Sequence, residues 1–173
     1  STKDDSKTKL TAGTNDDESV NEESLRFTNS DLASEKGITA VETEFAEFNL
    51  GQGKDTVNIA KTLYRDDGFQ TFTVVNTGDA ASDTAEDDEI TIESYGDTDG
   101  QLVVNAQGGK DNVTATSDKI TKDGMIVFGG SGADTIDVAK GVIALGDKGN
   151  IQYKKGNDVV TDLGYDNAGE IIY

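Results

Sequence analysis

The chain has 173 residues, enough for one domain or one elongated stack of repeats. Its 34 acidic and 15 basic residues give a net charge of -19, which disfavours binding to nucleic acid or to an anionic membrane and favours cations as partners. Cysteine and histidine are absent, so disulfides, thiol chemistry and the usual zinc ligands are excluded, and the oxygen ligands that suit Ca²⁺ remain.

The N-terminal segment, residues 1–22, is polar and contains two clearly apolar residues, Leu10 and Val20. This composition is typical of a linker, so we expect either a linker or a strand that a neighbouring copy of the chain orders. Residues 23–173 are predicted to form one folded domain. No stretch approaches the roughly 18 consecutive apolar residues of a membrane helix, so membrane insertion is not predicted.

A glycine-rich acidic turn recurs in this domain. Its copies are Gly53-Lys54-Asp55, Gly109-Lys110-Asp111, Gly132-Ala133-Asp134 and Gly156-Asn157-Asp158. Asp88 lacks the glycine, but alternating isoleucines follow it just as Val57 and Ile59 follow Asp55. The intervals between the aspartates are 33, 23, 23 and 24 residues. The long first interval contains a polar stretch at 77–87, which we interpret as an inserted loop.

A second acidic turn runs in phase with the first. Its copies are Asp67-Gly68, Asp99-Gly100, Asp123-Gly124 and Asp147-Lys148-Gly149. An apolar run follows each copy, in the order FQTFTVV, QLVVNA, MIVF and NIQY, and a third short apolar piece lies between units at Ile120 or at Val142, Ile143 and Leu145. Residues after the first turn alternate between apolar and polar, which predicts half-buried strands rather than helices.

A fixed period of about 23 residues predicts that the units stack, because one unit of this size cannot bury its own apolar face. The predicted fold is therefore all-β: a right-handed parallel β-helix with coils of about 23 residues. Residues 23–27, ESLRF, are expected to begin the first of about six coils, with Phe45, Phe48 and Leu50 in its second strand. No capping helix is evident at either end, so exposed strands such as residues 170–173 would be templates for another copy.

Stacking would place the aspartates of successive coils about 5 Å apart, where their charges repel. Two interpretations are open: the Gly-x-Asp turns serve only to turn the chain, or they hold a cation between coils. We favour the cation at the Gly-x-Asp turns and ordinary turn chemistry at the Asp-Gly turns. The candidate Ca²⁺ ligands are Gly53, Asp55, Asp88, Asp99, Gly109, Asp111, Asp123, Gly130, Gly132, Asp134, Asp147, Gly156 and Asp158.

The stretch GGSGADTIDV, residues 129–138, resembles the nonapeptide G-G-x-G-x-D-x-U-x of the RTX (repeats-in-toxin) family. The matching residues are Gly129, Gly130, Gly132, Asp134 and Ile136. The resemblance implies secretion by Gram-negative bacteria and folding on Ca²⁺ outside the cell. It is partial, since RTX coils have about 18 residues with glycine turns on both sides, whereas here one side keeps the glycines.

These features favour a secreted structural or adhesive protein of the cell surface or matrix, stabilised by Ca²⁺ and assembling with other copies of itself. A surface or matrix polysaccharide is a further candidate partner. One alternative is a module that binds glycans or ice. A less favoured one is a polysaccharide-cleaving enzyme using Asp97 with Asp99 or Asp66 with Asp67. We predict no enzymatic activity, because histidine is absent and arginine and aromatic residues are few.

Overall fold

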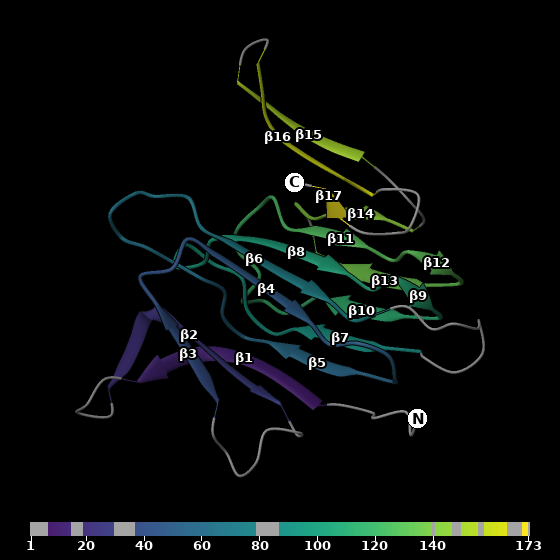
Figure 1. The fold of residues 1–173 in the computed structure, drawn as a ribbon, viewed down its shortest axis with the longest axis horizontal. Helices are drawn as coiled ribbons and strands as arrows, with labels where there is room; N and C mark the ends of the chain where they lie inside the picture. Colours follow the sequence, from purple (N-terminus) through teal and green to yellow (C-terminus); the bar gives the residue numbers. More distant parts are fainter. Residues whose placement is uncertain are drawn as a thin grey trace.

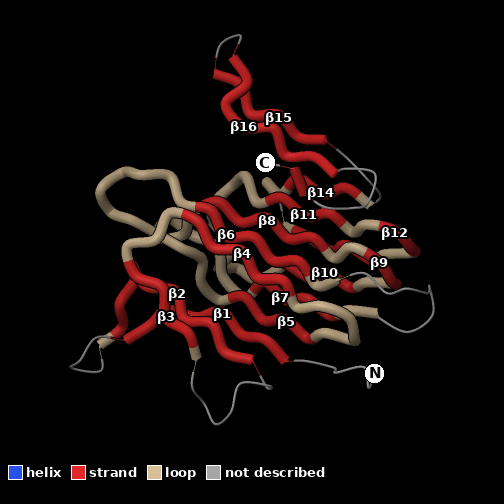
Figure 2. Tube along the Cα trace, viewed as in Figure 1, coloured by secondary structure: helices blue, strands red, loops and turns tan. Residues whose placement is uncertain are grey.

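The structure is a computed structural model that describes residues 7–14, 19–29, 37–78, 87–139, 141–146, 150–155, 158–165 and 171–172. These residues form strands joined by turns, with no helix among them, so the predicted all-β class is confirmed (Figure 2). The described part of the chain accordingly contains no helix able to cross a membrane. The long polar loop predicted at 77–87 falls mostly outside the described residues.

The larger sheet has seven strands in the order β13-β10-β7-β5-β1-β2-β3. Five of them run parallel: β1 (Lys7–Thr14), β5 (Thr56–Ile59), β7 (Glu89–Ile92), β10 (Asn112–Ala115) and β13 (Thr135–Val138). The register places Val57 beside Ile90, Ile90 beside Val113, and Val113 beside Ile136. Equivalent residues of successive sequence repeats therefore lie side by side in this sheet.

A second sheet has five parallel strands in the order β14-β11-β8-β6-β4. They are β4 (Phe45–Asn49), β6 (Phe72–Asn76), β8 (Gln101–Asn105), β11 (Ile126–Phe128) and β14 (Ile143–Leu145). From β4 onward the chain alternates between the two sheets and moves one strand along each time (Figure 1). A small parallel pair, β9 (Gly108–Gly109) and β12 (Ser131–Gly132), lies in the turns between them.

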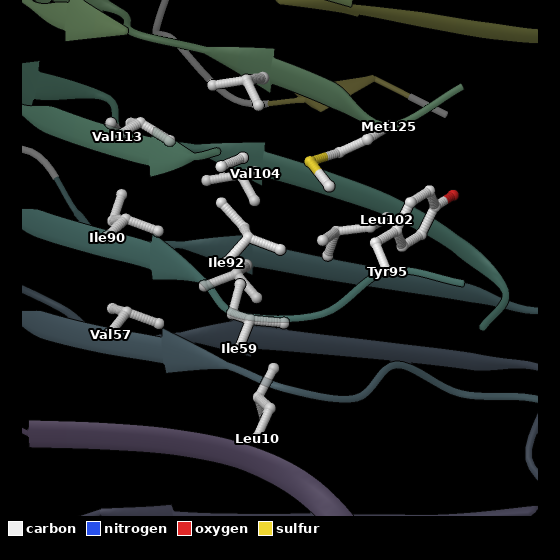
Figure 3. Packing of buried hydrophobic residues seen from close by; sticks show 14 of the residues in the cluster. Leu10, Val57, Ile59, Ile90, Ile92, Tyr95, Leu102, Val104, Val113 and Met125 are labelled. Atoms are coloured by element: carbon white, nitrogen blue, oxygen red, sulfur yellow. The ribbon is translucent and has the colours of Figure 1, made fainter. Parts of the chain in front are cut away.

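The main core is built from residues of both sheets, and equivalent side chains stack in rows (Figure 3). Val57, Ile90 and Val113 form one row, and Leu10, Ile59 and Ile92 another, all at most 1% exposed. Alternate residues of the larger sheet face outward, as predicted. Burying each such side chain stabilises the fold by about 1.5–3 kcal/mol, so the stacked rows are the main favourable term.

The three central strands of the five-stranded sheet, β6, β8 and β11, are buried on both faces. Alternate residues Val75, Val104 and Val127 belong to the main core, whereas Val74, Val103, Ile126 and Phe128 form a second buried cluster. This explains why the sequence shows continuous apolar runs at these strands instead of alternation.

The N-terminal part differs from the prediction. Residues 7–14 are neither a linker nor a strand ordered by another copy, because β1 pairs in parallel with β5 of the same chain and buries Leu10. The expected first strand at 23–27 instead lies in β2 (Val20–Asn29), which is antiparallel to β1 and to β3 (Ile38–Val41). The predicted second strand of that coil is confirmed as β4.

The hairpin of β2 and β3 covers one end of the core. Leu25 is 1% exposed, and the Phe27 ring stacks on the Phe48 ring of β4 with centroids 4.8 Å apart. Ala40 of β3 also packs against the core. A strand hairpin therefore caps the end where no capping helix is predicted (Figure 1).

The C-terminal part also differs from the prediction. β15 (Asn150–Lys155), β16 (Asp158–Tyr165) and β17 (Ile171–Ile172) form a separate antiparallel sheet. The expected last coil at Asp158 is therefore wrong, and β14, rather than NIQY, is the last parallel strand of its sheet. The Gly-Asn pair at 156–157 is a hairpin signal, and it favours chain reversal over another coil.

Candidate functional site

Two sets of turns connect the parallel sheets, and both carry predicted ligands. We call the turns that lead into the larger sheet, ending at Asp55, Asp88, Asp111 and Asp134, the Gly-Asp corner. We call the turns that contain Asp67, Asp99 and Asp123 and lead into the five-stranded sheet the Asp-Gly corner. Gly156 and Asp147 lie outside the described residues, and Asp158 lies in the separate C-terminal sheet, not at the Gly-Asp corner.

The four aspartates of the Gly-Asp corner form a column. Each comes one residue before a strand of the larger sheet, so its side chain falls on the inner face, the face of Val57 and Ile59. Asp55, Asp88 and Asp111 are only 1–2% exposed, and Asp134 is half-buried. The chain therefore holds a row of carboxyl groups at the edge of its core, where an unpaired charge is costly.

Hydrogen bonds connect each aspartate to the next coil. The backbone N–H of Asp55 donates to Oδ1 of Asp88 at 2.7 Å, that of Asp88 to Oδ1 of Asp111 at 2.9 Å, and that of Asp111 to Oδ1 of Asp134 at 3.1 Å. The carboxyl groups of Asp88, Asp111 and Asp134 thus fix the register of the neighbouring coil. This contact explains why Asp88 is present in a turn that lacks the glycine.

The two carboxyl oxygens of Asp111 differ in their hydrogen bonding. Oδ2 of Asp111 is buried and has no hydrogen-bond partner among the described residues. The pKa of Asp111 is raised to about 7, mainly because the carboxyl group is buried. The hydrogen bond from the N–H of Asp88 lowers this pKa, whereas the negative charges of Asp88, Asp134 and Asp87 raise it. A carboxyl group in this environment is stabilised either by a proton or by a cation.

The glycines of the corner are required by close backbone approach. Gly130 and Gly132 have φ angles of +94° and +136°, which favour glycine. A Cβ atom at Gly132 would lie 1.6 Å from the carbonyl oxygen of Gly109, and one at Gly130 would lie 1.8 Å from that of Gln107. The carbonyl oxygens of one turn therefore lie so close to the backbone of the next turn that only glycine fits there.

One position brings a carboxylate and a carbonyl together. A Cβ atom at Gly129 would lie 2.4 Å from Oδ2 of Asp134 and 2.6 Å from the carbonyl oxygen of Gly146. Two oxygens from different turns therefore converge on the side of Gly129 where a side chain is missing. Carboxylate and carbonyl oxygens are the ligands that Ca²⁺ takes, so the donor types at this corner fit calcium.

Carboxylates alone do not form a metal cluster. Among the described residues, no three acidic side chains lie close enough together to hold an ion. A cation at the Gly-Asp corner would therefore take one or two carboxylates from the column and complete its coordination with carbonyl oxygens such as that of Gly146.

The Asp-Gly corner is arranged differently, although Asp99 is also buried. Oδ1 of Asp99 accepts hydrogen bonds from the backbone N–H of Thr62 at 2.8 Å and from its hydroxyl at 3.1 Å, and Oδ2 accepts one from the N–H of Gly96 at 2.9 Å. Protein donors thus engage both oxygens of Asp99. This arrangement is typical of a structural carboxylate, the interpretation that the sequence favours for these turns.

Two lysines supply positive charge at the Asp-Gly corner. The ammonium of Lys61 donates to the carbonyl oxygen of Thr98, and that of Lys122 to the carbonyl oxygen of Asp99. Burial lowers the pKa of Lys122, while the charges of Asp99 and Asp97 raise it. The sequence analysis did not predict this role for Lys61 and Lys122, although a basic residue in or near an acidic turn was a signal for it.

The remaining candidates of this corner are more exposed. Asp123 lies at the surface, and Oδ1 of Asp123 would be 1.9 Å from a Cβ at Gly141. Asp67 accepts from Nε of Arg65 at 3.1 Å, and this hydrogen bond lowers the pKa of Asp67.

Comparisons of the chain with protein-family models, with curated proteins and with solved structures find no match.

Proposed function

We propose that the chain is a secreted structural or adhesive module, a right-handed parallel β-helix that Ca²⁺ stabilises at the Gly-Asp corner. The observation that carries the proposal is the buried aspartate column, in which Oδ2 of Asp111 has no hydrogen-bond partner among the described residues. The donor types fit Ca²⁺, and the resemblance of residues 129–138 to the RTX nonapeptide supports the same ion.

The alternation of the chain between two parallel sheets supports the β-helix. Each passage from β5 to β7, from β7 to β10 and from β10 to β13 goes through one strand of the five-stranded sheet. Parallel strands joined by such crossovers are right-handed in nearly all proteins, so we assign that hand to the coil.

In this proposal, Asp111 and Asp134 with carbonyl oxygens of the glycine turns hold the ion. Calcium neutralises carboxylates that otherwise repel each other across the column. The chain's own residues preorganise the site, because the Oδ1 hydrogen bonds fix the carboxyl groups and the glycines permit close approach of the turns. Ion binding would then stabilise the stack as a whole.

The structure gives little support to the enzyme alternative. Of the two carboxyl pairs that the sequence offers, Asp99 is engaged by backbone donors and Asp67 by Arg65. Neither pair therefore has two carboxyl groups available as acid and base. A structural or adhesive role outside the cell remains the function that we propose.

Self-association is the second part of the proposal. β13 and β14 are the edge strands at one end of the two sheets, and no further described strand is hydrogen-bonded to them. The hairpin of β2 and β3 covers the opposite end of the core. We therefore expect a second copy to join through the β13–β14 end.

The test is a Ca²⁺ titration of chelated protein, followed by far-UV circular dichroism, thermal unfolding and light scattering. We expect Ca²⁺ to raise the unfolding temperature and particle size of the wild type. Asp111→Asn should lose most of the thermal response, whereas Asp137→Asn, an exposed aspartate of β13, should keep it. A wild type with the same unfolding temperature in chelator and in Ca²⁺ would refute the calcium proposal, and monomers under both conditions would refute association.

A further inference from the structure

A groove runs beside the Asp-Gly corner, on the outside of the molecule. It consists of two depressions, of about 330 Å³ and 220 Å³, and Tyr64, Arg65 and Asp66 line both of them. Phe69, Asp97 and Lys122 line the larger depression. The volume of the larger one falls at the lower end of the range of small-molecule sites.

The groove has an ordered aromatic surface. Phe69 is 65% exposed, and the guanidinium of Arg65 lies over its ring at 5.2 Å from the centroid. Arg65 is itself held by Glu44, with Nη1 to Oε1 at 2.7 Å, and by Asp67. The exposed phenyl ring is therefore supported by an arginine that two carboxylates hold in place, which lowers the entropy cost of using the ring for binding.

Polar groups of both signs surround this ring. Asp66, Asp97 and Gln70, all exposed, and Lys122 line the same depression: a carboxylate can accept hydrogen bonds from a ligand, and an amide or an ammonium can donate them. A polyanion would meet the carboxylates and the net charge of -19, and a simple cation would meet Arg65 and Lys122. A neutral ligand with hydroxyl groups and an apolar C–H face suits all these groups.

We propose that this groove binds a neutral oligosaccharide. One sugar ring packs its C–H face on Phe69, and its hydroxyls bond Asp97 and Gln70 in the larger depression. The next sugar lies across Arg65 toward Asp66 in the smaller depression. This site is separate from the Gly-Asp corner, so binding does not require Ca²⁺ and does not depend on the calcium proposal.

The test is isothermal calorimetry and saturation-transfer NMR with neutral tetrasaccharides of glucose, mannose and galactose, in chelator. We expect at least one to bind, with saturation transfer to the sugar C–H protons. Phe69→Ala should weaken binding roughly tenfold, and Phe69→Trp, which keeps a ring, should retain it. Ile38→Ala is the matched control, because Ile38 is 62% exposed on β3 and lines neither depression.

Three outcomes would overturn the proposal. These are no binding by any neutral tetrasaccharide at millimolar concentration, equal binding by Phe69→Ala and the wild type, and binding only of an acidic oligosaccharide such as an alginate tetramer. Circular dichroism of each variant checks that the fold is kept, and the Phe69→Trp result decides the question if the alanine variant fails to fold.

Discussion

The two corners of the stack solve the same electrostatic problem in different ways. Both place buried carboxyl groups between coils, at Asp111 and at Asp99. At the Asp-Gly corner, backbone donors engage both oxygens of Asp99, and lysines of the same chain supply the positive charge. At the Gly-Asp corner one oxygen of Asp111 has no such donor, and its pKa rises to about 7. The calcium proposal therefore concerns the Gly-Asp corner, where Oδ2 of Asp111 has no donor among the described residues, and not the Asp-Gly corner.

The largest effect is expected from the backbone of the Gly-Asp corner. Gly132→Val should destabilise the fold by at least about 4 kcal/mol, because it combines an unfavourable positive φ with an overlap between Cβ and a backbone oxygen. Urea unfolding measures this loss. Gly146→Ala is the matched control, because a Cβ there meets nothing within 4 Å, and equal losses in the two variants would contradict the close-approach argument.

The next effect concerns pH at the same corner. The pKa of Asp111 rises from 3.8 to about 7 on folding, so the folded state holds a proton that the unfolded state loses between these values. The free energy of unfolding should therefore fall as pH rises from about 4 to 7, by on the order of 4 kcal/mol for this group, and stay level above. Asp111→Asn should remove this slope.

The measurement is chemical unfolding of the wild type and of Asp111→Asn in chelator between pH 4 and pH 7. The two proteins are compared because the other carboxyl groups contribute equally to the pH dependence of both. Saturating Ca²⁺ should reverse the preference, because the ion binds the ionised carboxylate and competes with the proton. A difference between the two proteins that does not vary with pH would show that Asp111 does not titrate in this way.

The sequence repeat predicts the central part of the molecule better than its two ends. The period of the aspartates and of Val57, Ile90 and Val113 predicted the parallel strands, because stacked coils repeat the same inward positions. The antiparallel strands before β4 and after β14 were not predictable in this way, since a terminal coil lacks one neighbour and does not repeat the inward positions of the stack. The contact from Asp99 to Thr62 spans 37 residues, and no local motif encodes it.

At the Asp-Gly corner, Asp99→Ala should cost about 3 kcal/mol, because it leaves the buried N–H of Thr62 and the partly buried N–H of Gly96 without acceptors. The loss should be equal in chelator and in Ca²⁺, unlike that of Asp111→Asn. Thermal unfolding under both conditions tests this contrast. A Ca²⁺-dependent loss for Asp99→Ala would mean that both corners bind the ion.

The smallest effect is expected for the internal cation itself. Lys122→Met keeps the length of the side chain but removes the ammonium that bonds the Asp99 and Gly100 carbonyl oxygens, so a loss of about 1 kcal/mol is expected. Lys119→Met, at an exposed lysine near by in the sequence, should change little. If the ammonium substitutes for a metal ion, the stability of Lys122→Met should also respond more to added Ca²⁺ than that of the wild type. An unchanged response would show that the backbone donors to Asp99 suffice to stabilise this corner, and that the difference between the corners lies in hydrogen bonding rather than in charge.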